Sequence, residues 1–419
     1  MIAFAAGVLL TLGFKDFYPD LERRFRRRRR GDAVNSVAGA GLERGSKVDL
    51  QDHTRRDTAD PSVSDIPQGI EACIGNTPLF RINSLSDATG CDILGKAEFL
   101  NGGGGSPKDR VALNIINTAE EQGLLAPHSG DMVYEGTVGS TGISLATICR
   151  ARGYLAYICM PSDQATEKSD LLLKLGAVVE RVPPAPIIDP MHFVNRARTL
   201  AAEHTADPDR PGRGFFANQF EIEYNWQAHF EGTGPEIFRQ CGGKLDAFVA
   251  GAGTGGTIAG VARYLKPRLP NVKIVLADPQ GSGLFNRIKY GVMFDPKEKE
   301  GTRRRQQVDT IVEGIGINRV TANFEAGREL VDDAIKIDDD EAIALARWLV
   351  EKDGIFVGSS SAVNCAAAVK LARKLGPGHR IVTILCDSGT RHLSKFWAKA
   401  GDIGDSSGGR LEDLIGLDD

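Results

Sequence analysis

The sequence predicts a parallel α/β fold, and two observations carry this prediction. From about residue 66 onward, short apolar runs typical of buried strands alternate with longer stretches of helical periodicity. Several of these runs also pass directly into turns rich in glycine, serine and threonine that open a helix, as in "FVAGAGTGGTIAGVARYL". Because parallel strands end at the same edge of a sheet, we expect these turns to meet there and to form the binding site.

Composition limits the function classes. With 419 residues, of which 42% are apolar and 25% charged, the chain is long enough for one large domain or two lobes. The formal net charge of −4 gives a nucleic-acid partner no global electrostatic support. The seven cysteines lack C-x-x-C spacing, which indicates buried, reduced thiols. With seven histidines and no H-E-x-x-H motif, no metal site is expected.

The N-terminus differs from the rest of the chain. Residues 1–14, "MIAFAAGVLLTLGF", carry no charged side chain, and an arginine cluster follows at 23–30. As a helix the apolar run reaches about 21 Å, short of a hydrocarbon core of about 30 Å. A signal peptide would carry its positive charge before the apolar run. We interpret 1–31 as a membrane anchor that leaves the remaining chain in the cytosol, with a cleaved targeting peptide or a frayed terminus as alternatives.

Three further segments are predicted from composition alone. Residues 32–65 are polar and lack periodicity, so they are interpreted as a tether between the anchor and a folded domain that spans 66–397. The charged stretch 295–307 is expected to be a surface loop. Residues 398–419, which are rich in glycine and aspartate, are expected to form a flexible tail.

Four strand-to-helix turns carry the candidate chemistry. In "EFLNGGGGSPKDR", four glycines precede Lys108 at the head of a helix, a pattern that is also typical of a surface lysine. "EGTVGSTGISLA" offers free N–H groups that suit a carboxylate. "VAGAGTGGTIAG" satisfies G-x-G-x-x-G and suits any phosphate, including that of a dinucleotide with Asp278 as the ribose-binding acid. "VGSSSAVN" is the fourth, and together the turns predict a pocket for a ligand with several anionic groups.

Seven sequence blocks occur in the order seen in cysteine synthases and cystathionine β-synthases, the fold-type-II pyridoxal phosphate enzymes, and the chain resembles this family over about residues 66–397. The blocks are "IGNTPL", "K.EFLN..GG.SPKDR", "EGTVGSTGISLA", "NQFEIEYNWQAHFEGTGPEI", "GAGTGGTIAGVARYLK", "EGIG" and "GSSSA". The resemblance implies two parallel-sheet α/β lobes, the smaller over about 105–215, with pyridoxal 5'-phosphate in the cleft between them. It also implies a homodimer. The N-terminal anchor and "TVGSTG" in place of the usual "TSGNTG" resemble most the fungal mitochondrial outer-membrane type of cysteine synthase.

The resemblance assigns a role to each candidate residue. Lys108 matches the Schiff-base lysine, Ser360 matches the serine that faces the pyridine nitrogen, and Ser140 stands where the family has an asparagine beside the cofactor O3′. The implied phosphate cradle consists of Gly253, Thr254, Gly255, Gly256 and Thr257. The loop implied to bind the substrate α-carboxylate, helped by Gln219, consists of Thr137, Val138, Gly139, Thr141 and Gly142 around Ser140.

Two features depart from the simplest patterns. The glycine run before Ser106 is one residue longer than is typical of the family. Asp278 needs no ribose if the phosphate belongs to pyridoxal phosphate, so it is expected to be a strand-end or interface acid.

These assignments predict β-replacement. A lysine can hold the cofactor and then act as the base that removes the α-proton. A serine opposite the pyridine nitrogen leaves that nitrogen unprotonated, which favours loss of a β-leaving group over transamination. The expected reaction converts O-acetyl-L-serine, or another O-acylserine, and sulfide to L-cysteine. Cystathionine β-synthase-like activity, serine or threonine dehydratase activity, and a membrane-tethered inactive binding protein are the alternatives.

Overall fold

In the computed structural model, two β-sheets organise the described residues, which are 68–163, 166–293, 310–403 and 410–416. The larger sheet has the order β1 (Leu79–Arg81), β2 (Asp92–Ala97), β10 (Arg380–Leu385), β7 (Ala247–Gly251), β8 (Lys273–Pro279) and β9 (Asp333–Ile337). The smaller sheet has the order β5 (Val178–Val182), β4 (Leu155–Pro161), β3 (Met132–Gly136) and β6 (Gly214–Phe216). Apart from β1, which runs antiparallel to β2, all neighbouring strands in these sheets are parallel.

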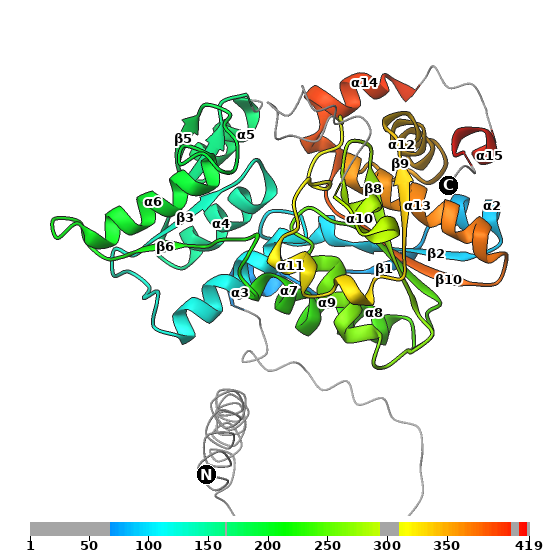
Figure 1. Ribbon diagram of the computed structural model, residues 1–419, viewed down its shortest axis with the longest axis horizontal. Coiled ribbons are helices and arrows are strands. Elements are labelled where there is room, and N and C mark those ends of the chain that lie inside the picture. Colours follow the sequence, from blue (N-terminus) through cyan, green and yellow to red (C-terminus); the bar gives the residue numbers. More distant parts are fainter. Residues whose placement is uncertain (1–67, 164–165, 294–309, 404–409, 417–419) are drawn as a thin grey trace, which may run out of the picture. The chain divides into compact units, whose positions relative to one another are not determined.

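Helices cover both sheets, and each sheet with its helices forms one lobe (Figure 1). The helices around the smaller sheet are α3 (Lys108–Glu121), α4 (Ser140–Ala151), α5 (Thr166–Lys174) and α6 (Phe193–Ala206). Those around the larger sheet are α2 (Asn83–Thr89), α7 (Tyr224–Ala228), α8 (Gly234–Gln240), α9 (Gly256–Leu265), α10 (Leu284–Tyr290), α11 (Ala322–Glu325), α12 (Asp339–Asp353), α13 (Ser359–Leu375), α14 (Ala398–Ala400) and α15 (Leu411–Leu414). The predicted α/β fold with two parallel sheets is confirmed.

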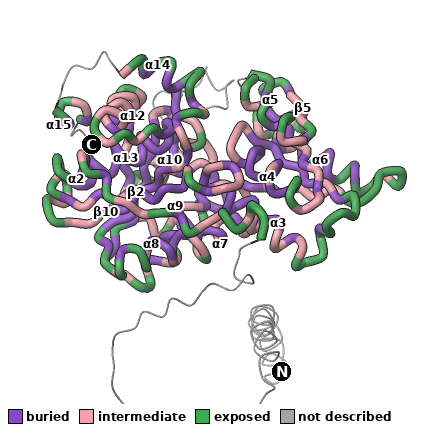
Figure 2. The backbone as a smooth tube through the Cα atoms, turned by 180° about the vertical axis from the view of Figure 1, so that it is seen from behind, coloured by how far each residue is buried: buried purple, intermediate pink, exposed green. Residues whose placement is uncertain are grey.

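Burial explains why these segments form parallel strands and central helices. In β8, "KIVLADP", every residue after Lys273 is buried, as expected for a parallel strand that is covered on both faces. Helix α13 is buried at every position from 359 to 372, because it packs against α12 and against strands β7, β9 and β10. Figure 2 shows this buried backbone at the centre of each lobe. The carboxyl ends of the strands are therefore held on a rigid support.

Helix α12 shows how local sequence signals set the ends of an element. The Asp338 side chain accepts a hydrogen bond from the Glu341 backbone N–H, and the Glu341 side chain accepts one from the Asp338 N–H, which forms a capping box. The helix ends at Gly354, which has a φ of 67° in the left-handed region that favours glycine. Both ends follow from residue type alone.

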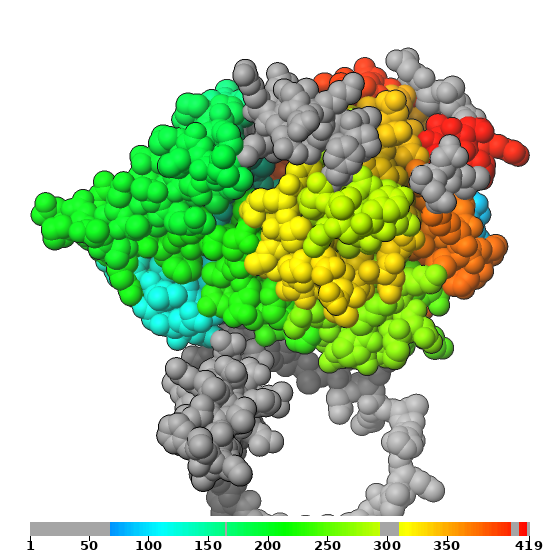
Figure 3. All heavy atoms as spheres, viewed as in Figure 1, coloured from blue at the N-terminus to red at the C-terminus, as the bar shows by residue number. Residues whose placement is uncertain are grey.

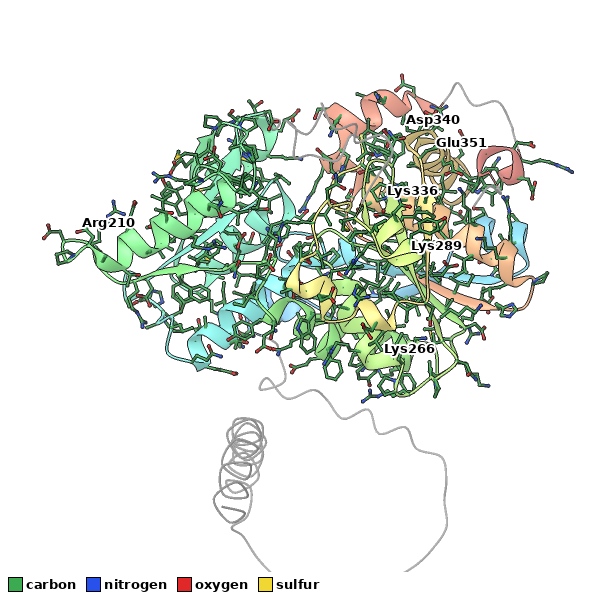
Figure 4. All side chains as sticks on the ribbon, viewed as in Figure 1. Arg210, Lys266, Lys289, Lys336, Asp340 and Glu351 are labelled. Carbon is green, nitrogen blue, oxygen red and sulfur yellow. The ribbon has the colours of Figure 1, made fainter. Side chains whose placement is uncertain are left out.

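The turn between α6 and β6 is an exposed feature of the smaller lobe. It forms the protruding end of that lobe in the space-filling view (Figure 3), and Arg210 lies at its tip (Figure 4). Arg210 pairs with Asp207 at 3.2 Å, and both side chains are exposed. At the base of the turn Asp131 accepts hydrogen bonds from the backbone N–H of Arg213 at 2.7 Å and from its guanidinium at 3.0 Å. The turn is thus fastened to β3, away from the carboxyl ends of the strands.

Several predictions from composition concern residues at the chain ends and in one loop. The predicted anchor (1–31), tether (32–65) and charged loop (295–307) lie outside the described residues. No helix in the described ranges combines the length and the apolar character of a membrane span. Within the predicted flexible tail, Leu411 and Ile415 are buried in the core of the larger lobe. This part of the tail is packed, because α15 turns an apolar face toward α12.

Candidate active site

A cavity of about 920 Å³ lies at the carboxyl ends of strands from both sheets. Ala250 and Gly251 at the end of β7, Ile384 at the end of β10, and Thr137 directly after β3 all line it. This is the position that parallel topology gives to a binding site. The cavity therefore joins the strand-to-helix turns that the sequence singles out.

The predicted site residues come together at this cavity. All except Gly142 and Gly256 line it, namely Lys108, Thr137, Val138, Gly139, Ser140, Thr141, Gln219, Gly253, Thr254, Gly255, Thr257 and Ser360. Gly142 lies in the first turn of α4 and Gly256 is the first residue of α9, and both are buried. A Cβ on Gly256 would lie 1.9 Å from Asn225 Oδ1, so close packing requires glycine there.

Lys108 is the first residue of α3 and its side chain enters the cavity half-buried. Within the described residues, Nζ makes no hydrogen bond and no ion pair. Burial lowers the pKa of the amine from its usual range, although the nearby Cys386 and Asp387 act in the opposite direction. A surface lysine without a partner would be hydrated and keep its usual pKa, so an unpaired amine whose pKa is lowered by burial favours a nucleophile or base.

The four-glycine run before Lys108 wraps around the carboxylate of Asp109. Asp109 Oδ2 accepts hydrogen bonds from the backbone N–H groups of Gly104 at 2.7 Å and Gly105 at 2.9 Å. Its Oδ1 accepts one from the Ser144 hydroxyl on α4 at 2.5 Å. A Cβ on Gly104 would lie 2.8 Å from that Oδ1, so a larger residue would push the loop away. Asp109 thus fixes the loop and the start of α3 together.

A buried charge network also holds the first turn of α3. The Arg110 guanidinium binds Glu98 through Nε at 2.7 Å and Glu236 through Nη1 at 2.7 Å. Lys96 Nζ donates to Glu236 at 2.6 Å and to the Thr77 carbonyl at 2.6 Å. Burial opposes ionisation of Glu236, but Arg110 and Lys96 lower its pKa to about 2. Because buried charges need partners, this network explains why three sequence blocks that are distant along the chain belong together.

The turn between β7 and α9 has the form of a phosphate cradle. Gly255 has a φ of 83°, and a Cβ there would lie 2.5 Å from the Phe324 Cα. A Cβ on Gly253 would lie 2.4 Å from the Gly314 carbonyl oxygen. Within the described residues, the backbone N–H groups of Thr254 and Gly255 have no hydrogen-bond acceptor. These N–H groups lie at the N-terminus of α9, where backbone geometry and the helix dipole favour an anion.

A buried histidine supports this cradle. His229 Nε2 lies 3.2 Å from the Thr257 hydroxyl, and Nδ1 lies 2.9 Å from the Thr233 hydroxyl. Burial lowers the pKa of His229 to about 3, so the ring is neutral at physiological pH. It therefore orients hydroxyl groups without adding charge. The block "NQFEIEYNWQAHFEGTGPEI" contains His229, but its role depends on contacts that the sequence does not reveal.

The loop after β3 lies opposite, at the start of α4. The Thr141 hydroxyl donates to Gln219 Oε1 at 2.6 Å, which brings together two residues that are 78 positions apart. Both side chains are buried and line the cavity. The Thr141 hydroxyl donates its single hydrogen to Gln219, so the backbone N–H groups of the loop are the donors suited to a carboxylate.

Ser360 lies in the first turn of α13 and is 4% exposed. The N-cap of α13 is Gly358, so Ser360 does not cap the helix. Burial raises the pKa of the neighbouring Cys386 thiol to about 11, and a hydrogen bond with Ser360 acts against this shift. The Asn364 amide lies 3.6 Å from the same sulfur. The segment "ILCDSG", which includes the end of β10, thus holds the Ser360 hydroxyl beside the cavity. Its cysteine, Cys386, is not among the site residues predicted from the sequence.

A second group that sequence reasoning missed is a charged cluster on the cavity wall. His392 Nε2 lies 3.0 Å from Asp387 Oδ2, and Nδ1 lies 3.4 Å from Glu313 Oε2. Burial alone would lower the pKa of His392, but Asp387 and Glu313 raise it to about 9. Lys168 on α5 also pairs with Glu313, at 3.0 Å. Asp387 follows a parallel strand, so the strand-end rule could have found it, and His392 lies five residues further on. Glu313 and Lys168 come from distant segments.

Asp278 does not belong to the cavity. It lies at the end of β8, is fully buried, and accepts a hydrogen bond from the Phe285 backbone N–H at 2.8 Å. Lys336, labelled in Figure 4, lies 3.5 Å from its carboxylate. Asp278 therefore caps a helix and pairs with a lysine in the larger lobe, as expected for a strand-end acid, and the dinucleotide interpretation loses its ribose-binding residue.

Comparison with known proteins agrees with this geometry. The model of the family described as pyridoxal-phosphate dependent enzyme matches residues 70–387. "Cysteine synthase 2" of Emericella nidulans is 66% identical over 423 aligned residues, which cover 99% of this chain and 96% of the relative. The Saccharomyces cerevisiae protein named "Putative mitochondrial cysteine synthase" is 54% identical over 344 residues, which cover 81% of this chain and 87% of the relative.

A solved structure shows the same relationship. The O-acetylserine dependent cystathionine beta-synthase from Helicobacter pylori superposes with a TM-score of 0.65 at 32% identity, covering 79% of this chain and 98% of that one. The chain therefore belongs to the cysteine synthase family of pyridoxal-phosphate dependent enzymes, and pyridoxal phosphate is its cofactor.

Proposed function

We propose that this cysteine synthase forms L-cysteine by β-replacement, in which sulfide displaces the acyloxy group of an O-acylserine such as O-acetyl-L-serine. The observation that best supports this proposal is the unpaired amine of Lys108 in a cavity that two candidate anion-binding loops and the buried Ser360 also line. In this reaction the Cβ–O bond breaks, acetate leaves, and a Cβ–S bond forms. The α-proton leaves before the acyloxy group and returns to Cα after sulfide adds.

The residues present fit the cofactor. Lys108 supplies the amine that would hold it covalently, and the N–H groups of Thr254 and Gly255 supply unused donors for a phosphate. Ser360 supplies a hydroxyl for the ring nitrogen, and Ser140 one for the ring oxygen. When bound, pyridoxal phosphate supplies an electron-withdrawing ring that makes the α-proton of an amino acid acidic.

Each residue then has a defined task. Lys108 Nζ, whose pKa burial lowers, is available in its neutral form to take the α-proton. The loop 137–142, which lines the same cavity, would bind the substrate carboxylate and so hold the amino acid beside that amine. The Ser360 hydroxyl would hold the ring nitrogen of the bound cofactor without giving it a proton, and an unprotonated ring would favour departure of the β-substituent. Closure of the loop 137–142 over the substrate carboxylate would exclude water from the reacting atoms.

The purified chain with pyridoxal phosphate is expected to form cysteine from O-acetyl-L-serine and sulfide. Cysteine formation would be measured for the acetyl and succinyl esters of serine, with unmodified serine as the control. A parallel reaction with homocysteine in place of sulfide tests cystathionine β-synthase-like activity, and keto-acid formation without a nucleophile tests dehydratase activity. Bound cofactor without turnover of any of these substrates would favour an inactive binding protein and overturn the proposal.

We further propose that the protein is a homodimer attached to the mitochondrial outer membrane by residues 1–31, with the catalytic part, 66–397, in the cytosol. The uncharged run 1–14 and the arginine cluster 23–30 support attachment and orientation. The name of the Saccharomyces cerevisiae relative supports the organelle. The tether 32–65 would give the catalytic part the distance it needs from the bilayer.

Removal of residues 1–31 is expected to release an active protein from the membrane fraction. The full chain should sediment with mitochondria, and protease added to intact mitochondria should digest its catalytic part. The shortened chain should remain in the supernatant, keep its cysteine synthase activity, and elute from a sizing column as a dimer. Recovery of the full chain in the supernatant would refute the membrane attachment.

A further inference from the structure

Glu135 is a buried acid near the cavity that the proposed reaction does not use. It lies on β3 directly before the loop 137–142 and is fully buried. Glu98 and Glu236, the other buried glutamates described, bind Arg110. Among the described residues no lysine, arginine or histidine pairs with Glu135. An acid in such a place is stable only if it is neutral or strongly hydrogen-bonded.

The hydrogen bonds of Glu135 lead to the carboxylate-binding loop. Its Oε2 accepts from the Gln219 backbone N–H at 3.2 Å, and its Oε1 accepts from the Gln219 side-chain amide at 3.4 Å. The same amide accepts the Thr141 hydroxyl through Oε1 at 2.6 Å. Glu135, Gln219 and Thr141 therefore form one chain, with the acid at its buried end.

The groups around Glu135 leave it without compensating charge. On the neighbouring strand β4, Cys159 interacts with it, and burial raises the pKa of that thiol to about 12, so it is uncharged. Strand β6 has no ionisable side chain, and α4 has none before Cys149. On α6, Arg196 pairs with Glu180, Arg198 lies over the Phe216 ring, and the His204 ring contacts Tyr134. Burial raises the pKa of the Glu135 carboxyl to about 8, against the opposing effect of the Gln219 hydrogen bonds. The carboxyl is therefore protonated at neutral pH and ionises as pH rises through about 8.

We propose that Glu135 is a positioning residue for the substrate carboxylate: in its neutral form it holds Gln219 against Thr141, and its ionisation weakens amino-acid binding by placing a negative charge behind the subsite. The proposal rests on the assignment of loop 137–142 to the substrate carboxylate. The substrate carboxylate would bind on one side of the buried Gln219 amide and Glu135 lies on the other. If Glu135 is ionised, the two negative charges therefore repel each other at low dielectric. Amino-acid affinity is thus linked to a proton that the substrate never contacts.

The test compares the wild-type holoenzyme with Glu135→Gln, which mimics the neutral acid and cannot ionise. Binding of L-serine, which lacks an activated leaving group, is measured from the change in cofactor absorbance at pH values about two units on either side of 8. The substrate amine and Lys108 titrate in both proteins, so the ratio of the two dissociation constants isolates Glu135. This ratio should stay near one below pH 8, and above it wild type should lose affinity relative to the variant by up to about tenfold per pH unit.

Two further variants separate positioning from general structure. Glu135→Ala removes support for Gln219 and should weaken L-serine binding about threefold to tenfold at every pH. Glu180→Gln removes a carboxylate on β5 that pairs with Arg196 in the same lobe, and it should bind L-serine with the wild-type pH profile. A constant ratio between wild type and Glu135→Gln across the pH range would overturn the proposal.

A measurement on the wild type needs no folded variant. Infrared difference spectra between neutral and alkaline pH should show loss of a protonated carboxyl band, and L-serine should shift this loss to higher pH. A carboxyl band that is absent at neutral pH would refute the neutral state. Because L-serine binding does not require turnover, failure of Glu135 as a positioning residue is distinguishable from failure of the cysteine-forming reaction.

Discussion

Replacement of Lys108 by alanine should reduce cysteine formation by roughly 10²- to 10⁴-fold, the range typical of a lost general base, and should remove the visible absorbance of protein-bound cofactor. The side chain makes no hydrogen bond or ion pair within the described residues, so its removal leaves no buried group unpaired. The network of Arg110, Glu98 and Glu236 continues to hold α3. The variant should therefore unfold cooperatively, near the wild-type denaturant midpoint.

Lys168→Ala is the matched control for this experiment. Lys168 also lines the cavity, but its ammonium pairs with Glu313 at 3.0 Å. Its loss should leave the cofactor absorbance in place and affect turnover less than loss of Lys108. Wild-type turnover of the Lys108→Ala protein would contradict a catalytic role for Lys108 and would favour its interpretation as a surface lysine.

The second large effect is expected from Ser360→Asp. A carboxylate beside a basic ring nitrogen favours the protonated ring, because opposite charges at short distance stabilise each other. A protonated ring draws electrons from the substrate more strongly and delays departure of the β-substituent. Cysteine formation should fall by orders of magnitude while the cofactor stays bound, as measured by turnover and by cofactor absorbance on the same sample.

Ser360→Ala is the companion variant, since it removes the hydroxyl without adding charge and should lose less activity. An interpretation of Ser360 as a helix cap predicts the reverse for Ser360→Asp, because aspartate is as good a cap as serine. Gly358 already occupies the cap position of α13, which argues against that interpretation. Wild-type turnover in Ser360→Asp would refute the role of Ser360 and the explanation of β-replacement from an unprotonated ring.

The sequence predicts the fold and the loops of the site because both depend on local patterns. Apolar runs such as "KIVLADP" predict buried strands, and glycine-rich turns after strands must meet at one edge of a parallel sheet. Lys108 and Gly255 could be named because each lies within or next to such a turn. Ser360 also opens a helix after small residues, but the strand predicted before it is only an isolated bridge at Val357. The family resemblance then supplied the roles that local pattern leaves open.

What the sequence does not predict depends on contacts between distant segments. Glu135 lies in the run "MVYEGT", which predicts only a strand. Its proposed role depends on its contact with Gln219, which only the structure shows. Glu313 and Asp387 raise the pKa of His392 to about 9, so the ring is protonated at neutral pH. The sequence spacing of these residues does not predict this effect. The composition of the tail predicts flexibility, but Ile415 is buried in the apolar core of the larger lobe.

The most direct test of the site is the identity of the lysine that carries pyridoxal phosphate. Borohydride reduction of the holoenzyme, followed by proteolysis and mass spectrometry, fixes the cofactor to its lysine. The modified peptide should contain Lys108, whose amine is free in the cavity. Modification of Lys96, which is bound to Glu236, or of Lys168, which is paired with Glu313, would contradict the site as described here.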